Sequence, residues 1–402
     1  SNPLLESGED GEQRQNKRFR VFGNIYLQMK PIEGLTLRSQ FAPQMIYKRE
    51  GVYIGPDSKN STGKAESTTA DYNQTLYWSY VWDNQVTYDK LFGLHHLNLS
   101  FVQSIQMEEW EYSNQSAKGF SYNSLWYNLG PSGLSNATKS TTDFEKRTLA
   151  SFLGRVQYSF NERYLLTLSG RYDGSSRLAA GNQWAFFPSA ALAWRMSEED
   201  FLKDFEQLSN LKLRISYGTT GNDAVDIYGT QSGISLKNYD FGGLTVPAYY
   251  KDRLANRELS WEKTNEINVG LDFGFFNSRI NGAIDVYRRD AKDLIMERKL
   301  PSTSGWTSIW DNIGHVRNVG VELQLNTVNV QTKDFTWETG FTFSKNHNEL
   351  IELYGGKKDD VTNKWFIGEP IDVNYDYVFD GIWQTDEAEQ AAVYGQKPGQ
   401  VK

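Results

Sequence analysis

Residues 146–177 carry the feature that most constrains the fold, a regular alternation of apolar and polar side chains. Apolar residues occupy every second position along 150–160, and the alternation resumes along 164–172 after the polar turn Asn161-Glu162-Arg163. Because side chains alternate across a strand, each segment predicts a β-strand with one apolar and one polar face. Two such strands joined by so short a turn form an antiparallel hairpin. These strands are long, with aromatic residues at both ends and charge on the polar face.

The composition favours strands that cross a membrane over a helical protein. Aromatic residues make up 14% of the chain although the mean hydropathy is only −0.61, which suits strands with aromatic girdles at two membrane interfaces. No run of about 18 apolar residues occurs, so the sequence predicts no transmembrane helix. A transmembrane strand needs only about 9–11 residues, so a membrane protein remains open.

The charge and the cysteine count exclude several classes of function. The chain has no cysteine, which rules out disulfides, thiolate catalysis and cysteine metal sites. Its net charge of −8 argues against nucleic acid as a partner. The first residues, SNPLLESGED, contain neither an initiator methionine nor a signal-peptide pattern. We therefore expect either a processed end or a piece of a longer chain.

The same alternation recurs along the chain and predicts twelve strands. The connections between them fall into short ones near 31–34, 90–94, 161–163, 277–278 and 330–334, and long ones at 48–72, 109–144, 220–260, 292–316 and after 348. If the loop at 175–183 points outward and the link at 196–210 points inward, short and long connections alternate throughout. That alternation is typical of an all-β, antiparallel, up-and-down transmembrane β-barrel with short periplasmic turns and long extracellular loops.

This interpretation divides the chain into three parts. Residues 1–17 form a polar leader, residues 18–347 the transmembrane barrel strands, and residues 348–402 an extracellular loop region. Within the barrel, Pro188 predicts a bulge or an end of pairing, because proline removes a ladder hydrogen bond. Ser197, followed by three acidic residues, predicts the start of a short helix that runs to about Glu206.

Several ordered motifs resemble a known family. YLLTLSGRYDGSSR, NQWAFFPSAALAWRMSEEDFLK, LSNLKLRISYGTTGN, LSWEKTNEINVGLDFGFFNSRINGAIDVYRRDAKDLI, LPSTSGWTSIWDNIGHVRNVGVEL and GEPIDVNYDYVFDGIW resemble, in this order, the barrel of SusC/RagA-type TonB-dependent outer-membrane transporters of Bacteroidetes. The resemblance covers most of the chain from Arg20 onward. It implies an outer-membrane protein of a Gram-negative bacterium.

The resemblance also implies what this chain lacks and what it works with. Family barrels have 22 strands and a lumen wide enough to need a plug, so we expect an internal portion of such a barrel, without the plug domain, the TonB box and the last strands. The family imports oligosaccharides or peptides with a SusD-like surface lipoprotein, driven by TonB-ExbB-ExbD through the plug. No enzymatic activity is implied.

Two groups of residues are candidates for function. Aromatic side chains stack on sugars and anchor peptides, and function concentrates on loops; the loop aromatics are Trp126, Tyr127, Tyr249, Tyr250, Trp306 and Trp310. The alternative for these is an interfacial or loop-packing role. The polar strand faces supply lumen-facing candidates, which otherwise are simply hydrated: Arg155, Arg171, Glu266, Asp285 and Glu322.

Catalysis and metal binding find little support. The four histidines, His95, His96, His315 and His347, have no neighbouring serine or aspartate pattern that would indicate a nucleophile system. We therefore expect no enzyme, no resident metal and no cofactor. Asp359 and Asp360 could help to bind calcium in an outer loop, since hard cations prefer clustered oxygens, but a solvated acidic pair is the simpler interpretation.

Two other functions stay open at this point. One is a passive outer-membrane porin or an adhesin barrel, which would need neither plug nor TonB. The other is a soluble β-rich glycan-binding module, which would extract into buffer without detergent. Neither the substrate nor the oligomeric state follows from the sequence.

Overall fold

The structure is a computed structural model that describes residues 6–61, 67–120, 123, 125–129 and 139–402. Its strands join into one 15-stranded sheet. The strands are β1 (Glu12–Phe22), β2 (Ile25–Ile32), β3 (Leu35–Ile54), β4 (Thr69–Phe92), β5 (His95–Lys118), β6 (Lys139–Phe160), β7 (Tyr164–Ser175), β8 (Trp184–Arg195), β9 (Leu208–Asn222), β10 (Gly233–Phe241), β11 (Leu244–Leu254), β12 (Glu262–Phe275), β13 (Ile280–Lys299), β14 (Ser308–Gln331) and β15 (Thr336–Leu353).

Twelve strands form a continuous antiparallel wall within the described residues. β1 and β2 both pair with β3, so they act as one strand interrupted at Gly23. β10 and β11 form a separate hairpin, which pairs with the wall where β11 meets β14 over two residues. The remaining strands follow one another in sequence order, and the predicted number of wall strands is confirmed.

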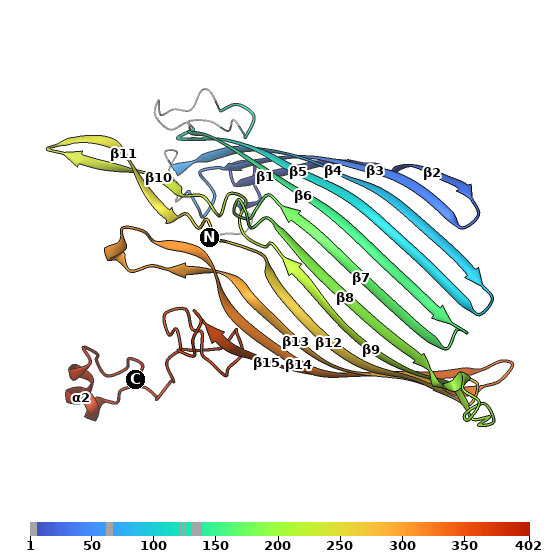
Figure 1. Cartoon of the computed structure of the whole chain (residues 1–402). Helices are drawn as coiled ribbons and strands as arrows, with labels where there is room; N and C mark the ends of the chain where they lie inside the picture. The colour runs from blue at the N-terminus through green and yellow to red at the C-terminus, as the bar shows by residue number, and fades with distance from the viewer. Residues whose placement is uncertain (1–5, 62–66, 121–122, 124, 130–138) are drawn as a thin grey trace.

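The connections alternate in length as the sequence indicated. Short turns lie at one end of the wall and long connections at the other (Figure 1). The loop after β7 joins the long end and the link after β8 joins the short end, so both ambiguous connections point the way that the alternation required. At the three-residue connection before β7, Asn161 and Glu162 adopt positive φ values of 53°, as the two central residues of a type I′ turn require, and the Arg163 N–H donates to the Phe160 carbonyl.

One face of the wall is apolar and largely exposed in the isolated chain. Aromatic residues mark its two borders on β6–β8: Phe160, Tyr164 and Trp194 form one row, with ring centroids 6.4 and 6.5 Å apart. Tyr172 lies in the other row and stacks on Trp184 at 4.9 Å. The rows are eight residues apart on β7, or about 26 Å along a strand, enough for a tilted strand to cross most of an apolar band about 25 Å tall.

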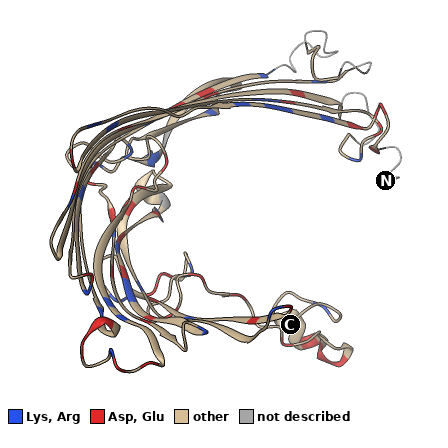
Figure 2. Cartoon of the chain, turned by 90° about the vertical axis from the view of Figure 1, so that its right-hand side faces the viewer, with Lys and Arg blue, Asp and Glu red and all other residues tan. Residues whose placement is uncertain are grey.

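The sheet curves into an open trough (Figure 2). Side chains of the opposite, polar face from five neighbouring strands, β3–β7, line one hollow together, which places this face on the concave side. Val316 and Leu350 share this face with Asn318, because alternate residues of a strand point the same way. Trp365 and Ile367, from the segment after β15, pack against that pair.

The strands are longer than the sequence indicated. β1 begins at Glu12, inside the predicted leader, and β15 continues to Leu353, beyond the predicted barrel limit of 347. The predicted loops at 48–72, 109–144 and 292–316 are in large part strand, and the loop at 220–260 contains the hairpin β10–β11. The reason is that backbone pairing continues past the apolar band, where no alternation of side chains is required.

The predicted helix from Ser197 to about Glu206 is wrong. A short 3-10 turn, η2 (Met196–Glu198), takes its place, followed by turns. Glu199 does not serve the first turn of a helix but accepts hydrogen bonds from the Tyr164 hydroxyl at 2.5 Å and the Trp194 indole at 2.9 Å. These donors hold the pKa of Glu199 below its ordinary value. The link is thereby anchored to the aromatic border of the wall.

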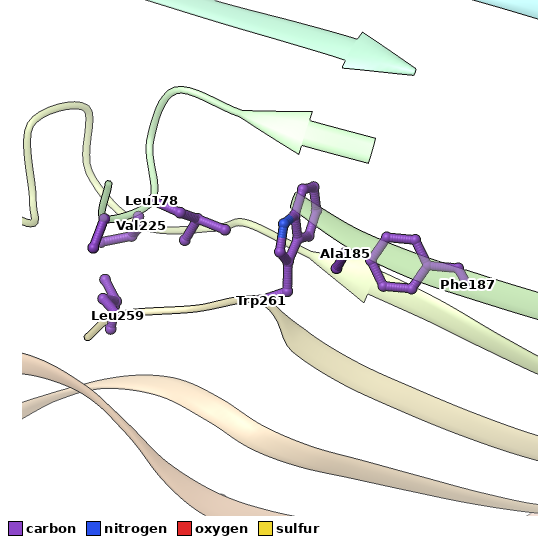
Figure 3. Close-up of a cluster of buried hydrophobic side chains, with 7 residues drawn as sticks. Leu178, Ala185, Phe187, Val225, Leu259 and Trp261 are labelled. Carbon is purple, nitrogen blue, oxygen red and sulfur yellow. The ribbon is translucent and has the colours of Figure 1, made fainter. Parts of the chain in front are cut away.

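Pro188 marks the end of a ladder, as predicted. β8 pairs with β9 only from Ser189 to Arg195, whereas its pairing with β7 continues past the proline. Side chains close the remaining gap: Trp261 is 4% exposed, packs edge-on against Phe187 at 5.3 Å, and donates its indole N–H to the Gln183 carbonyl (Figure 3). This apolar seam replaces backbone hydrogen bonds near the long connections.

Candidate functional site

The polar face of the wall carries two hollows that a solute could occupy. The smaller, of about 300 Å³, lies on β3–β7. In it the predicted residue Arg171 donates from Nε to Asp173 at 2.7 Å and from Nη2 to the Ser151 hydroxyl at 3.0 Å. Arg38 and Asp83 line its other side. Because opposite charges face each other across it, this hollow suits a solute with both donors and acceptors.

The larger hollow, of about 760 Å³, lies on β1 and β3–β5, toward the long connections. Tyr77 and Trp110 form its aromatic side, with ring centroids 5.1 Å apart and planes tilted by 49°. Arg18, Lys48 and Gln44 supply polar groups around the rings. Exposed ring faces beside cations and amides can stack on a sugar or an apolar side chain while the polar groups bind hydroxyls or carbonyls.

An ion-pair network stiffens the far side of the trough. Arg214 on β9 reaches Asp272 on β12 at 2.8 Å and the predicted residue Asp285 on β13 at 3.1 Å. The predicted residue Glu266 pairs with Arg289 at 2.6 Å. All these side chains are partly accessible, so the charges can exchange a protein partner for a solute at modest cost.

The two remaining lumen-facing candidates, Arg155 and Glu322, lie on the same polar face but form no ion pair with the other three among the described residues. Arg155 is exposed, with Ser100 and Ser169 opposite it on the neighbouring strands. Glu322 is exposed and lies opposite Asp285. The five predicted residues therefore share a face without forming one cluster.

The loop aromatics lie in different places. Trp126 packs with Tyr53 and Phe120 at the end of β3–β5, and Tyr127 contacts it edge-on at 5.7 Å while remaining 70% exposed. Register places Tyr53 on the apolar face of the wall, so the Trp126 cluster covers the outside rather than the trough. Tyr249 lies on β11, in the projecting hairpin (Figure 1).

The other three loop aromatics follow the same division. Tyr250 is the neighbour of Tyr249 on β11 and points to the opposite side of the hairpin. Trp306 is half-buried in the turn between β13 and β14. Trp310, on β14, packs against the seam cluster around Trp261. The structure brings none of the six into the larger hollow, and their contact with a substrate stays a prediction.

Sequence reasoning missed Tyr77 and Trp110. Trp110 fell in a segment interpreted as loop, because β5 continues there without apolar alternation. Tyr77 belongs to the polar side of a strand whose apolar side already held several aromatics. The signal that could have found them is an aromatic residue out of phase with the apolar face of its own strand.

The histidines make ordinary side-chain contacts. His95 Nδ1 lies 2.6 Å from the Tyr158 hydroxyl, His96 lies 3.2 Å from Asp89, and His315 lies 2.9 Å from Asp290. None of these contacts includes a serine or threonine hydroxyl, so the geometry offers no activated nucleophile among them.

The acidic pair in the outer segment, Asp359 and Asp360, accepts hydrogen bonds from neighbouring residues of the chain. Asp359 accepts the Ile367 N–H at 2.8 Å, and Asp360 accepts the Tyr354 hydroxyl at 2.7 Å and the Asn363 amide at 2.8 Å. Burial and this carboxylate together raise the pKa of Tyr354 to about 12. Across the described part of the chain no group of three histidine or acidic side chains is placed to hold a metal. Calcium at this pair stays a prediction.

Known proteins define the class to which this wall belongs. The family described as "TonB dependent receptor-like, beta-barrel" matches residues 10–397. The chain belongs to this family. In the described residues, no helix is long and apolar enough to span a membrane.

Relatives share the sequence over most of the chain. TonB-dependent receptor SusC of Bacteroides thetaiotaomicron is 35% identical over 294 residues, which are 70% of this chain and 29% of the relative. TonB-dependent receptor P3 of Formosa agariphila is 32% identical over 401 residues, 95% of this chain and 39% of the relative. The chain thus spans well under half the length of these curated relatives. They are receptors, in accordance with the prediction of a chain that is not an enzyme.

Solved structures share the fold. The RagAB peptide transporter aligns with a TM-score of 0.82 at 26% identity, covering 90% of this chain and 40% of that chain. The siderophore receptor PiuA from Acinetobacter baumannii aligns with a TM-score of 0.52 at 13% identity, which shows the fold alone. The resemblance to SusC/RagA-type barrels inferred from the motifs is therefore confirmed.

Proposed function

We propose that the protein carrying this chain imports an oligosaccharide or a peptide across the outer membrane in a TonB-dependent manner. The observation that carries the proposal is the alignment of nearly the whole wall with a peptide transporter, combined with 35% identity to SusC. In this proposal the strands between 18 and 347 form the membrane wall, and residues 348–402 lie toward the outside.

The trough supports transport of a polar solute. Its face is charged and hydroxylated, its ion pairs are accessible to water, and its larger hollow combines Tyr77 and Trp110 with Arg18 and Lys48. A purely structural inner face would not need half-buried aromatic rings beside exposed cations. This arrangement accommodates a sugar ring as well as a peptide side chain, so both substrate classes stand.

Two partners complete the mechanism. A SusD-like lipoprotein would cover the end with long connections and retain substrate there. TonB with ExbB and ExbD would act from the other end on a plug inside the barrel, supplying energy from the inner membrane. The wall described here would contribute the lipid-facing surface, the lumen surface and the outer loops.

Uptake of labelled oligosaccharides and peptides by cells expressing the whole protein tests the proposal. We expect accumulation of one class only when both the protein and TonB are present. Uptake that persists without TonB, together with free ion conductance of the purified protein, would favour the passive porin. Surface binding without uptake would favour the adhesin, and release into buffer without detergent would favour the soluble binding module.

A further inference from the structure

The apolar face of β12–β14 ends abruptly in polar residues at the side of the long connections. Register and alternation place matching residues of the three strands in rows on this face. From the apolar band outward, the rows are Val269–Val286–Val321, Ile267–Arg288–Val319, Asn265–Asp290–Arg317 and Lys263–Lys292–His315. The face thus changes from wholly apolar to wholly polar within four residues of strand.

A shared carboxylate orients two arginines in these rows. Arg288 Nε donates to Asp290 at 2.7 Å and Arg317 Nε donates to the same carboxylate at 2.8 Å, with His315 Nε2 at 2.9 Å. Among the described residues, the Nη atoms of Arg317 make no hydrogen bond. Arg288 is about half exposed. Both guanidinium groups are therefore held in place with donors left for another acceptor.

The charges do not cancel within the wall. Arg288, Arg317, Lys263 and Lys292 are four cations beside the single carboxylate of Asp290. On β15, which pairs with β14, Lys345 and Glu349 lie on the same face and offset each other. Glu352 lies opposite His315 in the outermost row, beside Lys292. This basic band, defined as Lys263, Arg288, Asp290, Lys292 and Arg317, therefore keeps two positive charges after Glu352 is counted, in a chain whose net charge is −8.

We propose that the basic band binds the phosphate group of a lipid headgroup in the outward-facing leaflet. The band lies where the apolar rows end, which is the depth of the headgroups around an inserted wall. A planar guanidinium pairs with phosphate through parallel N–H donors, and lysines add attraction to an anionic surface. The inference rests on the proposed function only in placing the wall in a membrane.

Charge complementarity and continuity with the apolar band select this occupant. A soluble anion would gain nothing from apolar rows directly below its site, whereas a lipid places its phosphate and its acyl chains against both parts at once. A protein partner docked here would have to enter the bilayer to cover the valine rows.

Native mass spectrometry of the whole protein, released from neutral phosphatidylcholine nanodiscs that contain a small fraction of lipid A, tests the inference. We expect retention of lipid A to fall about fivefold for each arginine lost, and so about twenty-five-fold in Arg288→Gln/Arg317→Gln. The control is Arg289→Gln, which removes the next guanidinium in the sequence from the polar face, where it pairs with Glu266. This control should retain lipid A as the unchanged protein does.

A second variant separates binding from folding. Lys263→Gln/Lys292→Gln alters only exposed residues of the outermost row and should lower retention several-fold while the protein inserts normally. A parallel titration with inorganic phosphate should leave the retained lipid in place. Unchanged retention in both double variants, an equal loss in Arg289→Gln, or displacement by inorganic phosphate would each overturn the inference. Release of the unchanged protein into buffer without detergent would instead defeat the proposed function.

Discussion

Two aromatic side chains, Tyr77 and Trp110, lie on the polar face of the wall, out of phase with the apolar faces of their strands. Tyr77 and Trp110 touch each other across β4 and β5, yet both remain partly accessible from the larger hollow. Stacking on a ring is worth about 0.5–1.5 kcal/mol beyond the area it buries. If the protein imports a solute as proposed, a substrate that passes along this side of the trough would gain affinity from these two rings.

Replacing Trp110 tests this role. We expect Trp110→Leu to raise the substrate concentration for half-maximal uptake by about three- to tenfold. The matched control is Trp78→Leu, because Trp78 lies on the same sheet but on the apolar face. Equal effects of the two substitutions on uptake, measured at equal amounts of inserted protein, would contradict the assignment.

At this scale the sequence identified the face but not the site. Alternation and register put Arg171 and Asp285 on the polar side of their strands, since alternation depends only on position along a strand, and their exposure to a lumen stays a prediction. Which residues meet across strands depends on register, and no local pattern encodes register for the polar face. The contact between Trp110 and Tyr77 could therefore not be predicted from the sequence.

Individual strands obey two different sets of constraints along their length. Within the apolar band, every second side chain must be apolar, and there the sequence predicted each wall strand. Beyond the band only backbone pairing remains, as in the outer parts of β4 and β5, which pair through Lys118. The sequence analysis did not predict the hairpin β10–β11, for a different reason. Gly242-Gly243 is a hairpin signal, but it lay within a segment interpreted as a long loop.

The seam between β8 and β9 depends on side chains where other strands use backbone bonds. Trp261→Ala should lower the free energy of unfolding by about 3–5 kcal/mol, because it empties a buried site against Phe187. The control Trp337→Ala removes a tryptophan that is 55% exposed on the apolar face. Urea unfolding in lipid vesicles, followed by gel mobility, measures both. A loss no larger than that of the control would contradict the packing role of Trp261.

For the whole molecule, the division into two faces decides whether the chain enters a membrane at all. Val269 and Asn268 are neighbours on β12 but point to opposite faces. Arginine in the lipid-facing position near the bilayer midplane costs about 2–4 kcal/mol, whereas arginine toward the polar side is hydrated. Val269→Arg should therefore reduce the amount of protein assembled in the outer membrane, and Asn268→Arg should not. Membrane fractionation with immunodetection compares them, and similar yields would refute the assignment of faces.

The end of the β8–β9 ladder at Ser189 also affects how well the wall resists tension. Seven residues of β8 pair with β9, against 24 that join β4 to β5. In a closed ring, circumferential tension passes through every ladder in series, so the shortest one sets the load that the ring bears. When β1 and β2 are taken as one strand, no neighbouring pair in the described wall has fewer bonds to share that load. Where the ladder hydrogen bonds end, the packing of Phe187 against Trp261 would resist an outward strain that pulls β8 and β9 apart.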